Sequence, residues 1–273
     1  MKTLAIIQLT FRESLAKRTF MAFFAISTLV NLLLLAALDL DIVNGMDAYI
    51  SIMGQELDGN VHLADFVHRI ESVIAVGLFT GGLFMSLFAT SSLVPSFLDR
   101  GSIDLLLSKP LSRPQILLGR YLGAVAIVAF NIFYLVGVSW LILSLKTGIW
   151  NGGYLLSALM IVVTFAILFA LMTLMGVLTR SGPFSLMITY LILFFSPLLI
   201  QRDQIYALLS NRFYGHLLDA LYHGLPKTAE LGAITEQLVR GAAVGSWTPL
   251  LTSLAFGLAT LAAAGLLFQR KDF

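Results

Sequence analysis

The sequence has no cysteine among its 273 residues, and only 12% of them are charged. Without cysteine the chain forms no disulfide, offers no thiolate to a metal and performs no thiol catalysis. Hydrophobic residues make up 58% of the chain, and its mean hydropathy is +0.91. Both values lie outside the range of soluble globular domains. The composition therefore predicts an integral membrane protein.

Long uncharged runs predict the number of membrane crossings. A helix that crosses about 30 Å of hydrocarbon needs about 20 apolar residues. Six runs are long enough, so we predict an all-α protein of six transmembrane helices with both termini on one side. These runs are Thr19 to Leu38, the stretch between Glu71 and Asp99, Arg120 to Lys146, Tyr154 to Leu178, Pro183 to Ile200, and about Thr248 to Phe268.

The distribution of charge predicts the orientation, because Lys and Arg near span ends are retained in the cytoplasm. With the N-terminus inside, most of the 17 Lys and Arg residues fall on the cytoplasmic side, and most of the 15 Asp and Glu residues fall outside. We therefore expect a multi-pass protein of a bacterial or archaeal cytoplasmic (inner) membrane, with both termini in the cytoplasm. The basic inner face suits anionic lipid headgroups, but topology alone explains it, and nucleic acid is not implied.

Three segments outside the predicted spans have patterns of their own. Residues 1–18 carry apolar residues three or four apart, which predicts an amphipathic helix in the inner interface, or else an extension of the first span. The acidic outer loop 39–70 suggests short pieces rather than a folded domain. In the outer segment 202–247, apolar residues recur every four positions until Pro226, and TAELGAITEQLV follows as a second amphipathic helix. We treat all of these as parts of one transmembrane domain, 1–273.

Few polar residues fall inside the predicted spans, and every charge is expected in a loop or at a span end. This pattern argues against a proton-coupled carrier. Asn31 and Asn131 either line a substrate path or form hydrogen bonds between helices. The glycines of GLFTG, at 77 to 81, allow close helix approach, either within the chain or to a second copy.

Metal binding is not expected from the sequence. His216, Asp219 and His223 share one face of a predicted helix, but a metal site needs three or four convergent ligands. We interpret these residues as solvated or as part of an interface, and we expect no metal site.

The cytoplasmic connection 95–120 reads PSFLDRGSIDLLLSKPLSRPQILLGR. Pro110 prevents one continuous helix through it. Ser112 and Gln115, with Pro114 between them, fit a capping box that starts a new helix running into the third span. The chemistry predicts a short helix lying across the cytoplasmic ends of two spans, although any connection between spans needs turn residues and positive charge.

The stretch DRGSIDLLLSKPLSRPQILLGRYLG is similar to the loop signature of ATP-binding cassette (ABC) permeases of the type two exporter class. The matching positions are Asp99, Gly101, Ser102, Asp104, Leu106, Leu107, Pro110, Ser112, Arg113, Gly119 and Arg120. Asp99 and Ser102 depart mildly from the commoner Glu and Thr. The amphipathic N-terminal helix, the LPKTAEL stretch before the last span and the basic end FQRKDF extend the resemblance over most of the chain.

The resemblance implies that this connection is a coupling helix held in a groove of a separate ATPase subunit. The residues expected to carry the coupling are Asp99, Arg100, Gly101, Ser102, Asp104, Leu107, Lys109, Pro110, Ser112, Arg113 and Gln115. The chain has no Gly-Lys dipeptide and so no Walker A loop. We therefore expect a non-catalytic chain that binds no cofactor, a partner ATPase in two copies that binds ATP and Mg, and a second permease copy or a paralogue.

Three functions remain open at this point. An exporter would use the ATPase to move a solute. A scaffold would use the same ATPase to move a periplasmic or envelope partner, and would need the segments 39–70 and 202–247 to bind protein. An ATP-independent carrier or channel would bind no ATPase.

Overall fold

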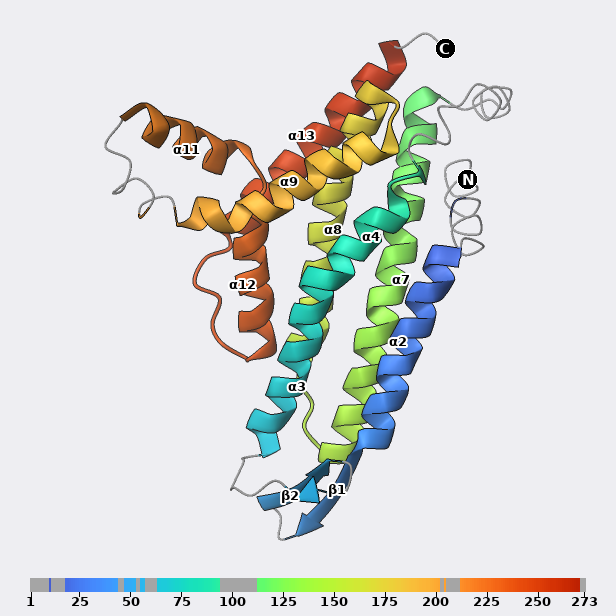
Figure 1. Cartoon of the computed structure of the whole chain (residues 1–273), viewed down its shortest axis with the longest axis vertical. Coiled ribbons are helices and arrows are strands. Elements are labelled where there is room, and N and C mark those ends of the chain that lie inside the picture. Colours follow the sequence, from blue (N-terminus) through green and yellow to red (C-terminus); the bar gives the residue numbers. More distant parts are fainter. Residues whose placement is uncertain are drawn as a thin grey trace.

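The computed structural model describes residues 10, 18–43, 47–52, 55–56, 63–93, 112–201, 204 and 212–270. The predicted interfacial helix 1–18 lies almost wholly outside these residues, as does the predicted coupling loop up to residue 111. Helices make up nearly all of the described chain, and they form one elongated bundle (Figure 1).

Two long helices, α2 (Arg18–Ala37) and α7 (Arg113–Thr147), lie side by side at one edge of the bundle (Figure 1). Their contact includes stacked rings of Phe24 and Tyr134, with centroids 4.5 Å apart. Near the other end of the pair, the Lys146 ammonium donates a 2.9 Å hydrogen bond to the Leu35 carbonyl oxygen. The first predicted span thus packs on the third.

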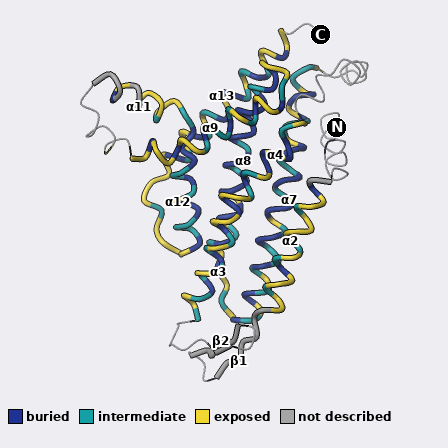
Figure 2. Tube along the Cα trace, in the orientation of Figure 1, coloured by how far each residue is buried: buried dark blue, intermediate teal, exposed yellow. Residues whose placement is uncertain are grey.

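Helix α8 (Gly152–Thr179) is the centre of the bundle and contacts α7, α9, α12 and α13. Its sequence is apolar on all faces, as expected of a helix surrounded by others. Figure 2 shows it buried along most of its length, whereas α2 is exposed on its outward side.

The second span is built from three consecutive segments, α3 (Leu63–Gly77), the π-helix η1 (Leu78–Gly82) and α4 (Leu83–Thr90). It begins at Leu63, ahead of the predicted start at Glu71. The side chain of Glu71 is therefore inside a helix, and it is 0% exposed. The expectation that every charge lies in a loop or at a span end is wrong for this residue, because hydropathy alone ended the span at the first carboxylate.

Helices α9 (Gly182–Ile200) and α13 (Thr248–Arg270) complete the apolar bundle, and α11 (Arg212–Gly224) and α12 (Thr228–Val239) lie between them in sequence. The predicted amphipathic stretch TAELGAITEQLV is the whole of α12. Two of the amide groups at its start are satisfied from neighbouring helices, which fixes α12 against the bundle. Lys227 N donates to Ser253 Oγ and Ala229 N donates to Ser196 Oγ, each at 3.0 Å.

Five helical segments are long and apolar enough to cross a membrane, and they match the second to sixth predicted spans. They are Leu63–Thr90, Arg113–Thr147, Gly152–Thr179, Gly182–Ile200 and Thr248–Arg270. The apolar part of α2, Phe20–Ala36, is shorter than these. The multi-pass membrane protein is confirmed, and the exact six-span layout stays a prediction.

A small antiparallel sheet occupies part of the predicted outer loop 39–70 and departs from the all-α expectation. Its strands are β1 (Leu38–Val43), β2 (Asp47–Ile52) and β3 (Gln55–Glu56), in the order β1-β2-β3. Leu38 pairs with Ile52, and Val43 pairs with Asp47. The sequence LDLDIV alternates apolar and acidic residues, which is the period of a strand and not of a helix.

Candidate functional site

The predicted coupling loop is described only from Ser112 onward. Asp99, Arg100, Gly101, Ser102, Asp104, Leu107, Lys109 and Pro110 lie outside the described residues, so their predicted roles stay predictions. Helix α7 begins where the capping box predicts, with Ser112 as its N-cap in an extended conformation and Pro114 in its first turn. The Ser112 amide donates to Gln115 Oε1 at 3.1 Å, so the Gln115 half of the box is formed.

Arg113 joins the start of α7 to the end of the last helix. Its Nη1 donates to the carbonyl oxygen of Gln269 at 3.3 Å. Both ends are also anchored in the core, because Ile116 and Leu117 on α7 and Phe268 on α13 are buried. A protein interior is close-packed, so a displacement of the α7 terminus is passed on rather than absorbed there.

One turn deeper, α7 is tied to the central helix α8. The Tyr121 hydroxyl donates to the Ala166 carbonyl oxygen at 2.8 Å, and its ring stacks on Phe169 with centroids 5.5 Å apart. On the other side of the loop, Tyr190 of α9 donates to the Phe84 carbonyl oxygen at 2.6 Å, and the two rings stack at 4.2 Å. The helices that flank the predicted loop are thus each fixed to a different neighbour.

Sequence reasoning missed these tyrosines. A tyrosine within an apolar run carries a hydroxyl that needs a partner when it is buried, and that is the signal that singles it out. The partner itself is a backbone carbonyl on another helix, which no sequence pattern identifies.

The two predicted substrate-path residues lie on the face where α2 and α7 meet. Asn131 Oδ1 accepts a 2.8 Å hydrogen bond from Ser27 Oγ, and Asn131 is 8% exposed. This bond matches the second reading of Asn131, a link between helices. Asn31 is also buried, and its amide atoms have no hydrogen-bond partner among the described residues.

A second polar centre surrounds the side chain of Asn151, the N-cap of α8. Its amide nitrogen donates to Glu71 Oε2 at 2.6 Å and to the Val239 carbonyl oxygen at 2.7 Å. Its Oδ1 accepts from Gly153 N at 3.0 Å, and its backbone carbonyl accepts from Trp140 Nε1 at 2.9 Å. We call Asn151, Glu71, Val239, Gly153 and Trp140 the outer junction.

The outer junction connects four helices around a buried carboxylate. His68 Nδ1 lies 3.5 Å from Glu71 Oε2 and 3.0 Å from the Asn151 amide nitrogen. Asn151 has two amide hydrogens, and Glu71 and Val239 are its closer acceptors, so both hydrogens are used there. A buried carboxylate is tolerated when it is hydrogen-bonded. The sequence predicted no such centre, because its members come from distant positions.

Metal and catalytic centres do not emerge from the described part of the chain. No group of three or more His, Cys, Asp or Glu side chains is placed to hold a metal ion within those ranges. The arrangement that does emerge is mechanical: helix ends fixed to one another by backbone-directed hydrogen bonds, around a close-packed central helix.

Comparison with known proteins assigns this architecture to a family. The model of the ABC-2 family transporter proteins matches residues 4–273, which includes the predicted coupling loop and all the described helices. A comparison with curated proteins gave no match. The match confirms the resemblance carried by the 95–120 connection, and this chain belongs to the ABC-2 family of transporter proteins.

Proposed function

We propose that the chain is the membrane-spanning subunit of an ATP-driven exporter, with six spans and both termini in the cytoplasm. Two permease chains, or one chain and a paralogue, would form the pore, and two separate ATPase subunits would bind ATP and Mg beneath them. Family membership supports the permease role. The observation that carries the coupling is the bond from Arg113 to the Gln269 carbonyl oxygen, which joins the end of the predicted loop to the last helix.

The coupling follows from the fixed helix ends. ATP binding favours the closed state of the ATPase pair and shifts the population of the whole complex toward it. Closure displaces the loop 95–120, and the displacement reaches α7 and α13 through Arg113 and reaches α8 through Tyr121. On the other side, α4 passes the movement to α9 through the Tyr190 contact. The bundle then changes between inward-facing and outward-facing arrangements by movement of packed helices.

The test is site-specific crosslinking in the native host. A photoreactive amino acid replaces Lys109 in the predicted coupling loop, and the control places it at Lys146, at the opposite end of α7. After illumination, the chain is purified in mild detergent and its crosslinked partners are identified by mass spectrometry. An ATPase crosslinked from position 109 and not from position 146 supports the proposal. A chain that purifies with no ATPase after crosslinking at 109 rejects it and leaves a carrier or channel.

A scaffold that moves an envelope protein is the second candidate, and the outer segments favour it. The sheet β1–β3 and helix α11 both lie away from the central bundle (Figure 1). A stoichiometric periplasmic protein in the same purification, together with the ATPase, would shift the assignment from exporter to scaffold.

A further inference from the structure

A groove runs along the second span, between it and α12. Its deeper compartment has a volume of about 510 Å³ and its outer compartment about 780 Å³. Val76 and Glu236 line both compartments, so the two are parts of one groove. Volumes of this size are typical of sites for small organic molecules.

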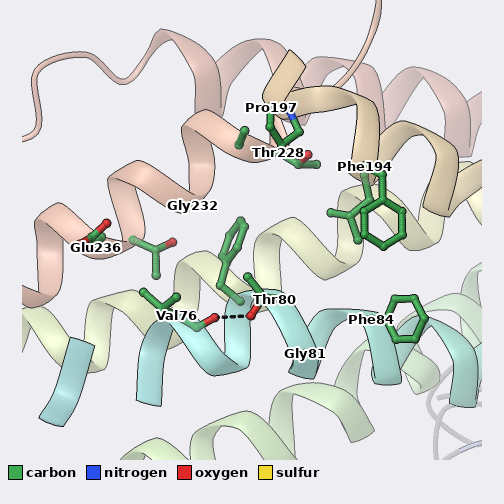
Figure 3. A pocket seen from close by; sticks show the side chains of 13 residues that line it. Val76, Thr80, Gly81, Phe84, Phe194, Pro197, Thr228, Gly232 and Glu236 are labelled. Atoms are coloured by element: carbon green, nitrogen blue, oxygen red, sulfur yellow. Dashed lines mark hydrogen bonds between the residues drawn. The ribbon is translucent and has the colours of Figure 1, made fainter. Parts of the chain in front are cut away.

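The deeper compartment is apolar. Its walls come from η1 and α4 on one side and from α9 and α12 on the other, with Phe84 and Phe194 among the labelled residues in Figure 3. Thr80 also lines it, but its hydroxyl donates to the Val76 carbonyl oxygen of its own helix at 2.8 Å. Thr228 Oγ1 has no hydrogen-bond partner among the described residues. Hydrocarbon is therefore the chemistry that this compartment favours.

The outer compartment is charged, with side chains of both signs. The residues that line it are Asp65, His68, Arg69, Ser72, Val73, Val76, Gly77, Glu236 and Arg240. Arg240 and Glu236 form an ion pair that stays largely exposed. Ser72 Oγ is buried without a partner among the described residues. This end offers two guanidinium groups, two carboxylates and a hydroxyl to a polar ligand.

The change from charged to apolar follows the direction of the helix. The charged residues are on the first turns of α3, toward the end of the bundle where β1 and β2 lie, and the apolar compartment lies further along the span (Figure 1). In the predicted orientation, the sheet is on the outer side. The groove thus has its polar end at the outer surface and its apolar end toward the membrane interior, which is how a lipid sits in the outer leaflet.

Two glycines show how the groove is shaped. A Cβ at Gly232 would lie 2.9 Å from the Phe79 ring, so α12 approaches η1 closely only because this position has no side chain. A Cβ at Gly81 would meet no heavy atom within 4 Å. The first glycine brings the walls together, and the second leaves space that a ligand can fill.

We propose that this groove binds a single phosphate-bearing amphiphile, with its hydrocarbon chain in the deeper compartment and its zwitterionic head between Arg69, Arg240, Asp65 and Glu236. Guanidinium groups bind phosphate oxygens well, and the carboxylates suit an ammonium group on the same head. A second copy of the chain is the competing occupant, but the buried core of a protein interface is depleted of charged residues. That this amphiphile is the transported substrate rests on the proposed permease function.

The experiment is photolabelling in lipid nanodiscs of phosphatidylcholine that contain a phosphatidylethanolamine with a diazirine in its acyl chain. Labelled peptides are mapped by mass spectrometry. The wild-type chain is expected to be labelled around Thr80, Phe84 and Phe194 about tenfold more than at the lipid-exposed Leu29 and Leu258. Equal labelling at all exposed positions would mean ordinary surrounding lipid and would overturn the proposal.

Variants that fill the groove give the decisive comparison. Gly81→Leu places a side chain in open space, and Val76→Trp blocks the junction of the compartments from a position that is 43% exposed. Both are expected to reduce labelling of the groove about tenfold. The control Gly137→Leu on α7, where a Cβ also meets no atom within 4 Å, is expected to leave it unchanged. Labelling that survives both groove variants would contradict the site.

The head is tested separately. Arg69→Gln combined with Arg240→Gln is expected to lower labelling by the phosphatidylethanolamine probe roughly five- to tenfold, and a diacylglycerol probe without phosphate is expected to label poorly even in the wild type. Equal labelling by the two probes would overturn the zwitterionic assignment. Crosslinks from position 81 to a second copy would assign the groove to a dimer. ATPase capture from position 109 is measured on the same samples, so loss of labelling with the ATPase still bound rejects the ligand and leaves the permease function intact.

Discussion

Arg113 and Gln269 are 156 residues apart in the chain, yet the guanidinium of the first donates to the carbonyl oxygen of the second at 3.3 Å. The bond joins the first turn of α7 to the last turn of α13. A carbonyl at the end of a helix has no partner within that helix, so a cation suits it there. A movement at the predicted coupling loop therefore reaches the C-terminal end of the bundle in one step.

Charge reversal at this position tests the coupling. Arg113→Glu removes the donor to Gln269 and places a negative charge at the end of the loop. We expect the protein to insert normally and ATPase association to fall about tenfold, measured by quantitative mass spectrometry of purified complexes. Lys146→Glu, at the other end of the same helix, should not change association. Unchanged association in Arg113→Glu would show that this arginine is not part of the contact.

The absence of cysteine makes the topology directly measurable. Single cysteines at Ser112 and Trp150 lie at opposite ends of α7, and Trp150 is well exposed. With the predicted orientation, an impermeant maleimide labels Trp150→Cys in intact cells and labels Ser112→Cys only in inside-out vesicles. Arg270→Cys should behave like Ser112→Cys, because α13 ends on the same side. The reverse pattern would place the 95–120 connection outside and contradict an ATPase at that surface.

Local patterns in the sequence predicted the fold well where the signal is local. The stretch TAELGAITEQLV is α12, and the Ser112 to Gln115 pattern marks the start of α7. The sheet was missed although its signals are present: LDLDIV and DAYISI flank Asn44-Gly45, a dipeptide that favours a tight hairpin. In a chain with so many apolar runs, the short loop appeared too small to have structure of its own.

The outer junction and the groove could not be predicted in the same way. Asn151 and Glu71 are 80 residues apart, and no periodicity relates them. The groove depends on where α12 lies against the second span, which follows from packing and not from composition. Gly81, in the GLFTG motif, indicated close helix approach, but within this chain its surroundings are open.

The outer junction should contribute measurably to stability. Asn151→Ala removes hydrogen bonds to Glu71 and Val239 and leaves a buried carboxylate without its closest partner. We expect a loss of about 2 kcal/mol, which corresponds to a fall in Tm of about 4–8 °C for a chain of this size. Thermal unfolding in detergent measures it. Asn151→Ala combined with Glu71→Gln should recover part of the loss, because a neutral amide costs less to bury than a charge. A Tm unchanged in the single variant would contradict the role of the junction.

Two adjacent glycines at the start of α8 provide the sharpest test of the packing there. At Gly153 a Cβ would collide with the carbonyl oxygen of Leu238 on α12, a backbone atom that cannot rotate away, whereas at Gly152 a Cβ meets no heavy atom within 4 Å. Gly153→Ala is expected to destabilise the protein by about 1–3 kcal/mol through this collision. Gly152→Ala is expected to stabilise it by about 0.5–1 kcal/mol, since alanine is the better helix former. The same substitution one residue apart should thus shift Tm in opposite directions. Equal shifts would mean that α12 does not lie against α8 at this point, and the outer end of the proposed groove would lose its wall.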